Sequence, residues 1–162
     1  MRLPALLSAM LVAGTAGAQP EDELLSVPAK QVSCTSGPYR LKLPKSYAAL
    51  KRLAVLKREK VLGEEGGSTA RELRFVGLEM VVYTSAARPG QYQVARATFT
   101  TPKWRIMGPL RVGAPAALAL KELKLRHVPR HGEIVLEGEA DSVLLSVAGG
   151  KVQEIDYECA TE

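Results

Sequence analysis

The two histidines of the chain, His127 and His131, are the first candidates for metal or acid–base chemistry. Their spacing of four residues would place both rings on one face of a helix, but Pro129 lies between them and disfavours a helix there. A catalytic zinc site takes three protein ligands, and Glu133 is the one carboxylate that adjoins the pair. We therefore interpret both histidines as solvated loop residues and predict no metal site.

A second candidate is an acidic alternation near the C-terminus, formed by Glu154, Asp156 and Glu158. On a strand these carboxylates point the same way, about 7 Å apart, a spacing that suits calcium or a basic partner. The other interpretation is a solvent-facing stripe that keeps a terminal strand from pairing with other chains. We favour the stripe over a calcium site, and we retain the three residues as candidates for contact with a partner protein.

Enzymatic machinery is hard to assemble from the remaining residues. Nucleophilic catalysis needs a Ser, Cys or Thr placed against a base, whereas both histidines share one loop and no Gly-x-Ser-x-Gly motif occurs. The glycine-rich segment 63–67 contains two glutamates, which repel phosphate. We predict a protein with no catalytic activity and no cofactor.

Tyrosine, tryptophan and arginine dominate protein interfaces when they cluster. Aromatic residues make up only 5% of this chain, yet several lie near its centre together with arginines. The candidate partner-contacting residues of this kind are Tyr83, Tyr92, Arg96, Trp104 and Arg105. For Trp104, an equally weighted alternative is that it fills the space between two halves of the fold.

The N-terminus carries the pattern of an export signal. Arg2 is followed by an apolar stretch and then by Ala16-Gly17-Ala18, the small-residue pattern of a signal-peptide cleavage site. The apolar stretch is shorter than the ~20 residues of a membrane-spanning helix. We predict a signal peptide at 1–18, an N-terminal extension at 19–33 and a periplasmic or secreted protein, for which nucleic acid is a poor partner.

Composition and cysteine content narrow the class further. A length of 162 residues suits one domain, and a hydrophobic content of 46% excludes a disordered chain. Cys34 and Cys159, near the two ends of the mature chain, are too few for a disulfide scaffold or a four-thiolate zinc site. In an oxidising compartment we favour a structural disulfide between them over two free thiols or one redox-active cysteine, with a stabilisation of about 4–5 kcal/mol.

An internal repeat organises the chain. The segment 37–44, Gly-Pro-Tyr-Arg-Leu-Lys-Leu-Pro, is echoed by 108–115, Gly-Pro-Leu-Arg-Val-Gly-Ala-Pro. Each copy leads into a predicted helix, at 45–62 and at 116–126, and the segments after them, 63–68 and 127–132, are predicted as loops. Three strands follow each loop, at 71–76, 78–84 and 92–100 and at 133–137, 142–147 and 151–159.

These elements predict an α+β fold made of two tandem helix-plus-three-stranded antiparallel units. The first unit spans 34–102 and the second spans 103–162, and the two share one sheet. The disulfide joins the N-terminal and C-terminal ends.

The alternation of apolar and polar residues assigns the two faces of the predicted sheet. The face toward the helices is predicted to carry Met80, Val82, Ala97, Phe99, Val143, Leu145, Ile155 and Tyr157. The opposite face is predicted to be wet and to carry Tyr83, Tyr92, Arg96, Thr98, Thr100, Ser142, Ser146, Glu154, Asp156 and Glu158. Such a face would be basic at one end and acidic at the other.

The first predicted helix, 45–62, is strongly basic. Its cationic residues are Lys45, Lys51, Arg52, Lys57, Arg58 and Lys60. A basic amphipathic helix can lie on an anionic membrane, which gives weak peripheral membrane contact as one interpretation. We favour the other interpretation, a helix packed on the core with a charged outer face.

The tandem arrangement, with Leu110-Arg111-Val112-Gly113 leading into a helix, resembles two related groups of small secreted proteins. These are the β-lactamase inhibitory proteins and the small periplasmic module of outer-membrane assembly lipoproteins. In their pattern a Leu-Gly-x-Pro-like turn follows the helix, and this chain has Leu125-Arg126-His127-Val128-Pro129 there instead. The resemblance implies a protein-binding scaffold without catalysis.

From these observations we expect an exported, non-enzymatic protein-binding module. An inhibitor or an immunity protein that neutralises a secreted or periplasmic enzyme fits this description. The alternative is an accessory protein of envelope assembly that binds membrane or cell-wall components through its basic helix.

Overall fold

The computed structural model describes residues 26–28, 32–107, 110–122, 124 and 132–161. The predicted signal peptide, most of the predicted extension and both histidines lie outside these residues. Within them, no helix is long and apolar enough to cross a membrane.

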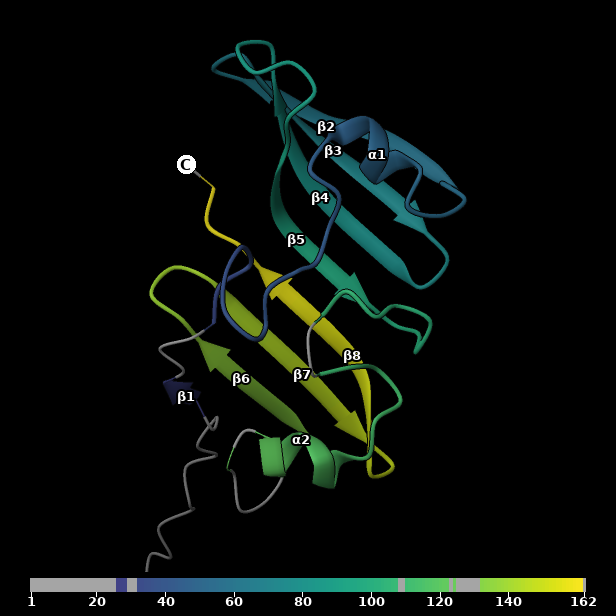
Figure 1. Cartoon of the computed structure of the whole chain (residues 1–162), viewed down its shortest axis with the longest axis vertical. Coiled ribbons are helices and arrows are strands. Elements are labelled where there is room, and N and C mark those ends of the chain that lie inside the picture. The colour runs from purple at the N-terminus through teal and green to yellow at the C-terminus, as the bar shows by residue number, and fades with distance from the viewer. Residues whose placement is uncertain (1–25, 29–31, 108–109, 123, 125–131, 162) are drawn as a thin grey trace, which may run out of the picture.

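One eight-stranded sheet forms most of the described structure (Figure 1). The strand order is β1-β6-β7-β8-β5-β4-β3-β2, and every neighbouring pair is antiparallel except β1 with β6. The strands are β1 Ser26–Pro28, β2 Arg58–Glu65, β3 Ser68–Phe75, β4 Leu78–Ser85, β5 Gln93–Phe99, β6 Glu133–Glu137, β7 Ser142–Ala148 and β8 Lys151–Glu158. The fold is therefore mostly β, with seven strands in antiparallel order.

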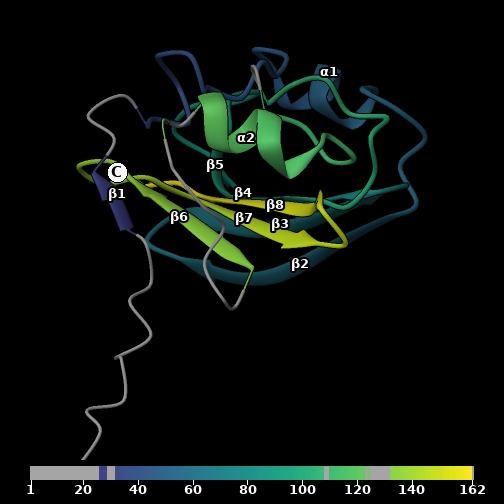
Figure 2. The ribbon, with the colours of Figure 1, turned by 90° about the horizontal axis from the view of Figure 1, so that it is seen from below.

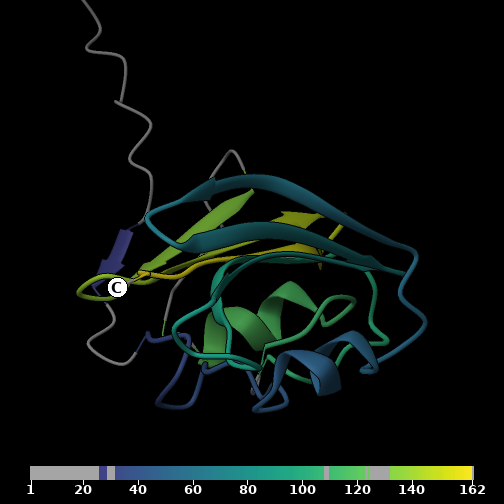
Figure 3. The same cartoon turned by 90° about the horizontal axis from the view of Figure 1, so that it is seen from above.

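The helical part is small. The two helices are α1 Tyr47–Lys51 and α2 Ala116–Glu122. Both lie on the same side of the curved sheet, together with the long connecting segments (Figures 2 and 3). The other side, which we call the outer face, is covered by no described helix.

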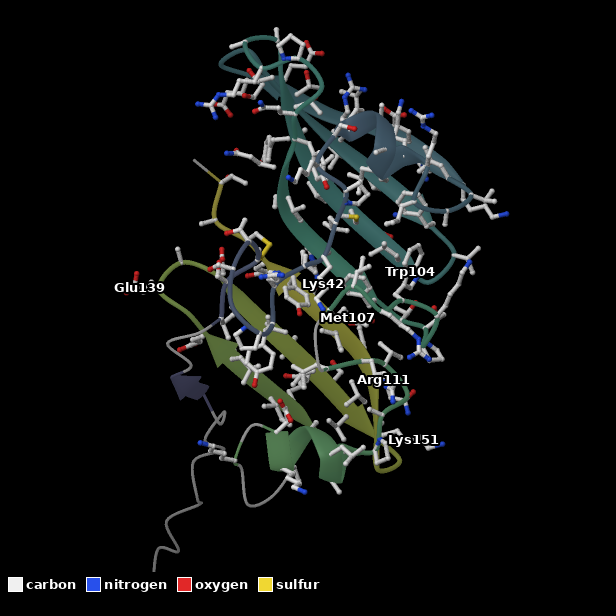
Figure 4. All side chains as sticks on the ribbon, viewed as in Figure 1. Lys42, Trp104, Met107, Arg111, Glu139 and Lys151 are labelled. Carbon is white, nitrogen blue, oxygen red and sulfur yellow. A yellow bond between two sulfur atoms is a disulfide. The ribbon has the colours of Figure 1, made fainter. Side chains whose placement is uncertain are left out.

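The core lies between the sheet and this helical layer, as the alternation predicts. All eight residues assigned to the inner face are fully buried: Met80, Val82, Ala97, Phe99, Val143, Leu145, Ile155 and Tyr157. The hydroxyl of Tyr157 donates to the backbone oxygens of Tyr39 at 2.7 Å and Met107 at 3.2 Å. Met107 lies beside β8 in Figure 4. The two hydrogen bonds therefore attach the segments that contain Tyr39 and Met107 to the central strand that they cover.

The predicted first helix, 45–62, is wrong over most of its length. Ser46 caps α1, its hydroxyl accepting the amide of Ala49 at 3.2 Å, and the helix ends after five residues at Lys51. Residues from Arg58 onward form β2 instead, because Gly66 and Gly67 close a two-residue hairpin with φ of 58° and 80°. The segment 63–68, predicted as a loop, is thus the end of one strand and a hairpin turn.

This correction changes the predicted units. The first part of the chain contributes four strands, β2 to β5, and the second contributes three, β6 to β8. The described structure is therefore not clearly two equal helix-plus-three-strand units. The predicted second helix, 116–126, begins as expected at Ala116 and ends at Glu122.

The predicted disulfide is confirmed. Cys34 and Cys159 are bonded, with 5.8 Å between their Cα atoms, across 125 residues of sequence. Asp141 holds both neighbouring segments, because its carboxylate accepts the amide of Cys34 at 2.7 Å and the amide of Ala160 at 2.8 Å. The two ends of the domain are thus joined by a covalent bond and by one shared carboxylate.

Candidate protein-binding surface

The outer face gathers five of the predicted partner-contacting residues. Arg96 and Tyr83 alternate with buried neighbours on β5 and β4 and so point away from the core. The acidic residues Glu154, Asp156 and Glu158 do the same on β8, which pairs directly with β5. Because β5 and β8 are adjacent, residues about 60 positions apart in the sequence share one surface.

An ion pair joins β5 to β8 at the centre of this face. Arg96 donates from Nε to Oδ1 of Asp156 at 3.1 Å and from Nη2 to Oδ2, and the hydroxyl of Thr98 contacts Oδ1 at 2.6 Å. The hydrogen bonds that Arg96 donates to the Asp156 carboxylate raise the pKa of Arg96. Asp156 is 6% exposed, whereas the Arg96 side chain is 54% exposed. A buried carboxylate therefore holds an exposed guanidinium in one orientation.

The same arrangement recurs on β3, where the sequence prediction missed it. The Nε atom of Arg74 lies 3.0 Å from a carboxylate oxygen of Glu72 and 3.1 Å from one of Glu79 on β4. Glu72 is 6% exposed, and the Arg74 side chain is 46% exposed. The alternation of Glu72 and Arg74 along the predicted strand was the signal available, since residues two apart share a face.

These two arginines border a hollow on the outer face, with a volume of about 490 Å³. Its polar lining comes from β3, β4, β5, β8 and the residue after β5: Arg74, Glu79, Arg96, Thr98, Thr100 and Glu154. Within the described part of the chain, no hydrogen bond involves the Nη1 atom of either arginine. Both groups therefore keep donor capacity for a ligand.

Tyr92 does not lie on the outer face, contrary to the prediction. Val81 pairs with Arg96 but Val82 pairs with Val94, so Ala95 is an extra residue in β5. This bulge reverses the alternation beyond it. Tyr92 consequently turns to the helical side, where its hydroxyl donates to the Pro44 carbonyl and its ring lies 6.4 Å from that of Tyr47.

Trp104 is 5% exposed and belongs to the core. Its indole N–H donates to the Val76 carbonyl at 2.9 Å, and its ring meets that of Phe75 edge-on at 5.9 Å. Phe75 and Val76 belong to β3 and the turn after it, so these contacts bury the tryptophan against the first half, and its expected place between the two halves stays a prediction (Figure 4). Arg105, the next residue, is exposed and lies outside the strands.

The basic residues predicted on one long helix are distributed differently. Arg58 and Lys60 lie on β2, and Lys51 of α1 pairs with Glu59 at 3.2 Å. Glu59 also accepts from Tyr47 at 2.7 Å and from Arg71 at 3.2 Å. The hydrogen bond from Tyr47 is the main reason why the pKa of Glu59 lies below its ordinary value. The long basic helix on which membrane contact was predicted is absent from the described segment 45–62.

Metal chemistry finds no support in the described residues. They contain no group of three or more His, Cys, Asp or Glu side chains that could hold an ion. In the predicted acidic stripe, Asp156 is already bound to Arg96 and Thr98. His127 and His131 lie outside the described residues, so the prediction for them stays untested.

A second hollow, about 560 Å³, lies beside the disulfide on the helical side and includes Lys45, Tyr92 and Asp141. The carboxylate of Asp141 is occupied by the two backbone amides described above. Asp141 therefore has a structural role beside the disulfide. For this reason we place the candidate site on the outer face.

Comparisons with protein-family models, with curated proteins and with solved structures found no match to this chain.

Proposed function

We propose that this chain is an exported, non-catalytic module that binds another protein on its outer face, as an inhibitor or an immunity protein does. The observation that carries the proposal is the pair of arginines beside the outer-face hollow. Arg74 and Arg96 are each about half exposed, and each is held by a carboxylate that is itself buried.

Pre-ordering of these side chains favours binding. Ordering a flexible side chain at an interface costs about 0.5–1.5 kcal/mol, and arginine is among the most flexible. Arg74 and Arg96 are already fixed by Glu72 and Asp156 in the free protein. Their exposed donors can therefore bind carboxylate or carbonyl groups of a partner with little further loss of entropy.

The lining of the hollow favours binding over catalysis. Among the described residues that form it, none is histidine, cysteine or lysine. Two arginines, two glutamates and two threonine hydroxyls supply hydrogen-bonding groups of both signs. Such a surface is suited to the polar groups of a folded protein.

The charge pattern indicates the kind of partner. The strands β2 and β3 carry three cations on this face, Arg58, Lys60 and Arg74, against two carboxylates, Glu65 and Glu72, whereas the strands β6 and β8 carry mainly carboxylates. We infer a partner whose surface has the reverse arrangement, acidic over β2–β3 and basic over β6–β8. Association should then be faster at low salt, because opposite potentials steer the encounter.

A tandem organisation of the chain is part of the proposal. The last strands of the two halves, β5 and β8, are neighbours, and Thr98 stands opposite Asp156. About that pair, the order β3-β4-β5 on one side matches β6-β7-β8 on the other. This supports a duplicated three-strand unit to which β2 adds a further strand at one end.

Export is supported by the sequence of residues 1–18 and by the disulfide, since such bonds persist in oxidising compartments. We expect the protein in the periplasmic or extracellular fraction with Gln19 as its first residue. N-terminal sequencing of that fraction tests this, and an uncleaved chain retained in the cytoplasm would contradict it.

The binding proposal is tested by capture from the envelope extract of the producing cell. The oxidised mature chain serves as bait beside two variants with the same charge change. Glu154→Arg alters the lining of the hollow, whereas Glu139→Arg alters an exposed turn residue at the edge of the molecule (Figure 4).

A stoichiometric protein retained by the wild type and by Glu139→Arg, and lost with Glu154→Arg, is the expected result. Equal retention by all three chains, or no retained protein, would overturn the proposal. Matching unfolding curves for the two variants exclude a folding defect as the cause.

A further inference from the structure

The strand β2 leaves one edge of the sheet open. It is the last strand in the order, it pairs with β3 alone among the described strands, and all eight of its residues are exposed. Figure 1 shows it at the end of the sheet beside α1. A long exposed strand edge has unpaired backbone groups and is a template for pairing with another strand.

Exposed apolar side chains gather at this edge. The described chain has five large hydrophobic residues that are strongly exposed, and three of them lie on or just before β2. Val55 is 72% exposed, Val61 is 47% exposed and Leu62 is 49% exposed. Association along β2 would remove apolar surface from water, which favours it.

The charges of β2 are complementary to those of a second copy. Its first half carries Arg58 and Lys60, and its second half carries Glu64 and Glu65. When two copies run antiparallel with Val61 of one opposite Leu62 of the other, Arg58 lies opposite Glu65 twice. Opposite charges in directly facing positions stabilise a strand pair.

The bulge in β2 supports this register. Val61 pairs with Arg71 and Gly63 with Ala70, so Leu62 is the extra residue. Because of this extra residue, the alternation of inner and outer side chains before Val61 is out of phase with the alternation after Leu62. When the two-fold axis lies between Val61 and Leu62, each residue of β2 faces a residue of the second copy that points to the same side of the sheet. A shift by one residue would set outer-face side chains opposite inner-face side chains.

One unfavourable pair in this register is already compensated. Glu59 of each copy would face Glu64 of the other on the inner side of the sheet, so this pair also occurs twice. Glu59 is bound to Lys51 and Arg71 of its own chain, so its charge is balanced before association. The outer-side pairs of Arg58 with Glu65 have no such prior partner in the described residues.

We propose that two copies of this chain associate through their β2 edges by antiparallel strand pairing. The two-fold axis passes between Val61 and Leu62, and the two sheets become one continuous sheet. This interface lies at the sheet edge and is separate from the outer-face hollow, so the outer-face hollow of each copy stays accessible in the dimer.

Charge reversal tests the register. Arg58→Glu makes β2 acidic at both ends and Glu65→Arg makes it basic at both ends, so each variant alone should weaken association about tenfold or more. An equimolar mixture should recover the dimer as a heterodimer, because each acidic end then faces a basic one. Sedimentation velocity at low and high salt measures all three samples beside the wild type.

A cross-link provides an independent readout. Both native cysteines are in the disulfide, so a single introduced cysteine has no other thiol in its chain. Directly facing strand residues lie at Cα distances that a disulfide can span. A mixture of Val61→Cys and Leu62→Cys chains should therefore cross-link faster than either chain alone under mild oxidation.

Two exposed basic residues away from β2 supply the controls: Arg111, which precedes α2, and Lys151, the first residue of β8 (Figure 4). Arg111→Glu and Lys151→Glu should leave association unchanged. A wild-type protein that stays monomeric, a mixture that does not recover the dimer, or association abolished by Glu154→Arg instead would overturn the proposal. Each of these outcomes leaves the capture experiment on the outer face independently readable.

Discussion

Arg96 and Asp156 connect the two halves of the chain at the centre of the sheet. They come from β5 and β8, 60 residues apart in sequence, and two guanidinium nitrogens donate to the two oxygens of one carboxylate. The carboxylate is nearly buried while the guanidinium remains about half exposed. Without Arg96, the buried carboxylate of Asp156 would lose its charged partner, whereas Arg96 without Asp156 would still be in contact with water.

Replacing Arg96 by alanine should destabilise the fold by about 1–3 kcal/mol, because Asp156 would retain only Thr98 as a side-chain partner. The matched control is Arg105→Ala, an exposed arginine off the sheet, which should change stability by less than about 0.5 kcal/mol. Urea unfolding at neutral pH measures both. Equal effects for the two variants would contradict the role assigned to the pair.

Acid should weaken the fold partly through Glu59. Its pKa is lowered from 4.5, first by the hydrogen bond from Tyr47, so the folded state binds its proton less tightly than the unfolded state. The stabilisation is therefore complete above about pH 4.5 and is lost as the pH falls through the folded pKa. Unfolding midpoints between neutral pH and about pH 3 should decline less steeply for Glu59→Gln than for the wild type. Parallel declines would refute this.

Gly77 is required both because its φ is positive and because there is no space for a side chain, and Gly90, which shares only the first property, serves to separate the two effects. Gly77 and Gly90 have φ of 73° and 80°, so alanine is strained at either position, by about 1–2 kcal/mol. At Gly77 a methyl group would also overlap the side chain of Thr101, whereas at Gly90 nothing lies within 4 Å. Gly77→Ala should cost roughly 1–3 kcal/mol more than Gly90→Ala in thermal or urea unfolding. Similar costs would mean that Thr101 moves aside freely.

Trp104 should report on folding. It is the single tryptophan and is buried, so its fluorescence should be blue-shifted in the folded protein and should move to the red on unfolding. Trp104→Ala should lower the free energy of unfolding by about 3–5 kcal/mol. Trp104→Phe should lower it less, because it keeps an aromatic ring and loses the hydrogen bond to the Val76 carbonyl and only part of the buried volume. Emission typical of a solvated indole before denaturation would contradict this placement.

Much of the sheet could be predicted because the patterns that indicate it lie within single strands or depend on a residue type with one possible partner. Apolar alternation at Val143, Leu145, Ile155 and Tyr157 identifies the inner face, since side chains on a strand alternate between two sides. The disulfide was predicted because the chain has two cysteines and a predicted export signal, which favours bonded over free thiols. Neither inference needs to know which strand lies beside which.

The end of α1 was predicted wrongly because the apolar spacing over residues 50–61 is compatible with either a helix or a strand. The turn at Gly66 and Gly67 and the pairing of β2 with β3 decide the matter. The glycine pair was visible in the sequence as a hairpin signal. A rule that weighs the two-residue turn above the helical pattern would have predicted the strand.

The sequence by itself therefore determined the buried face, the strands of the second half and the covalent closure, since each depends on alternation or on a residue type that has one available partner. Tertiary structure alone decided that Asp156 holds Arg96, that Glu72 holds Arg74, and that the bulge at Ala95 turns Tyr92 toward the helices. These features depend on the register between strands distant in sequence. Register is set by the packing of the whole sheet, and no single strand specifies it.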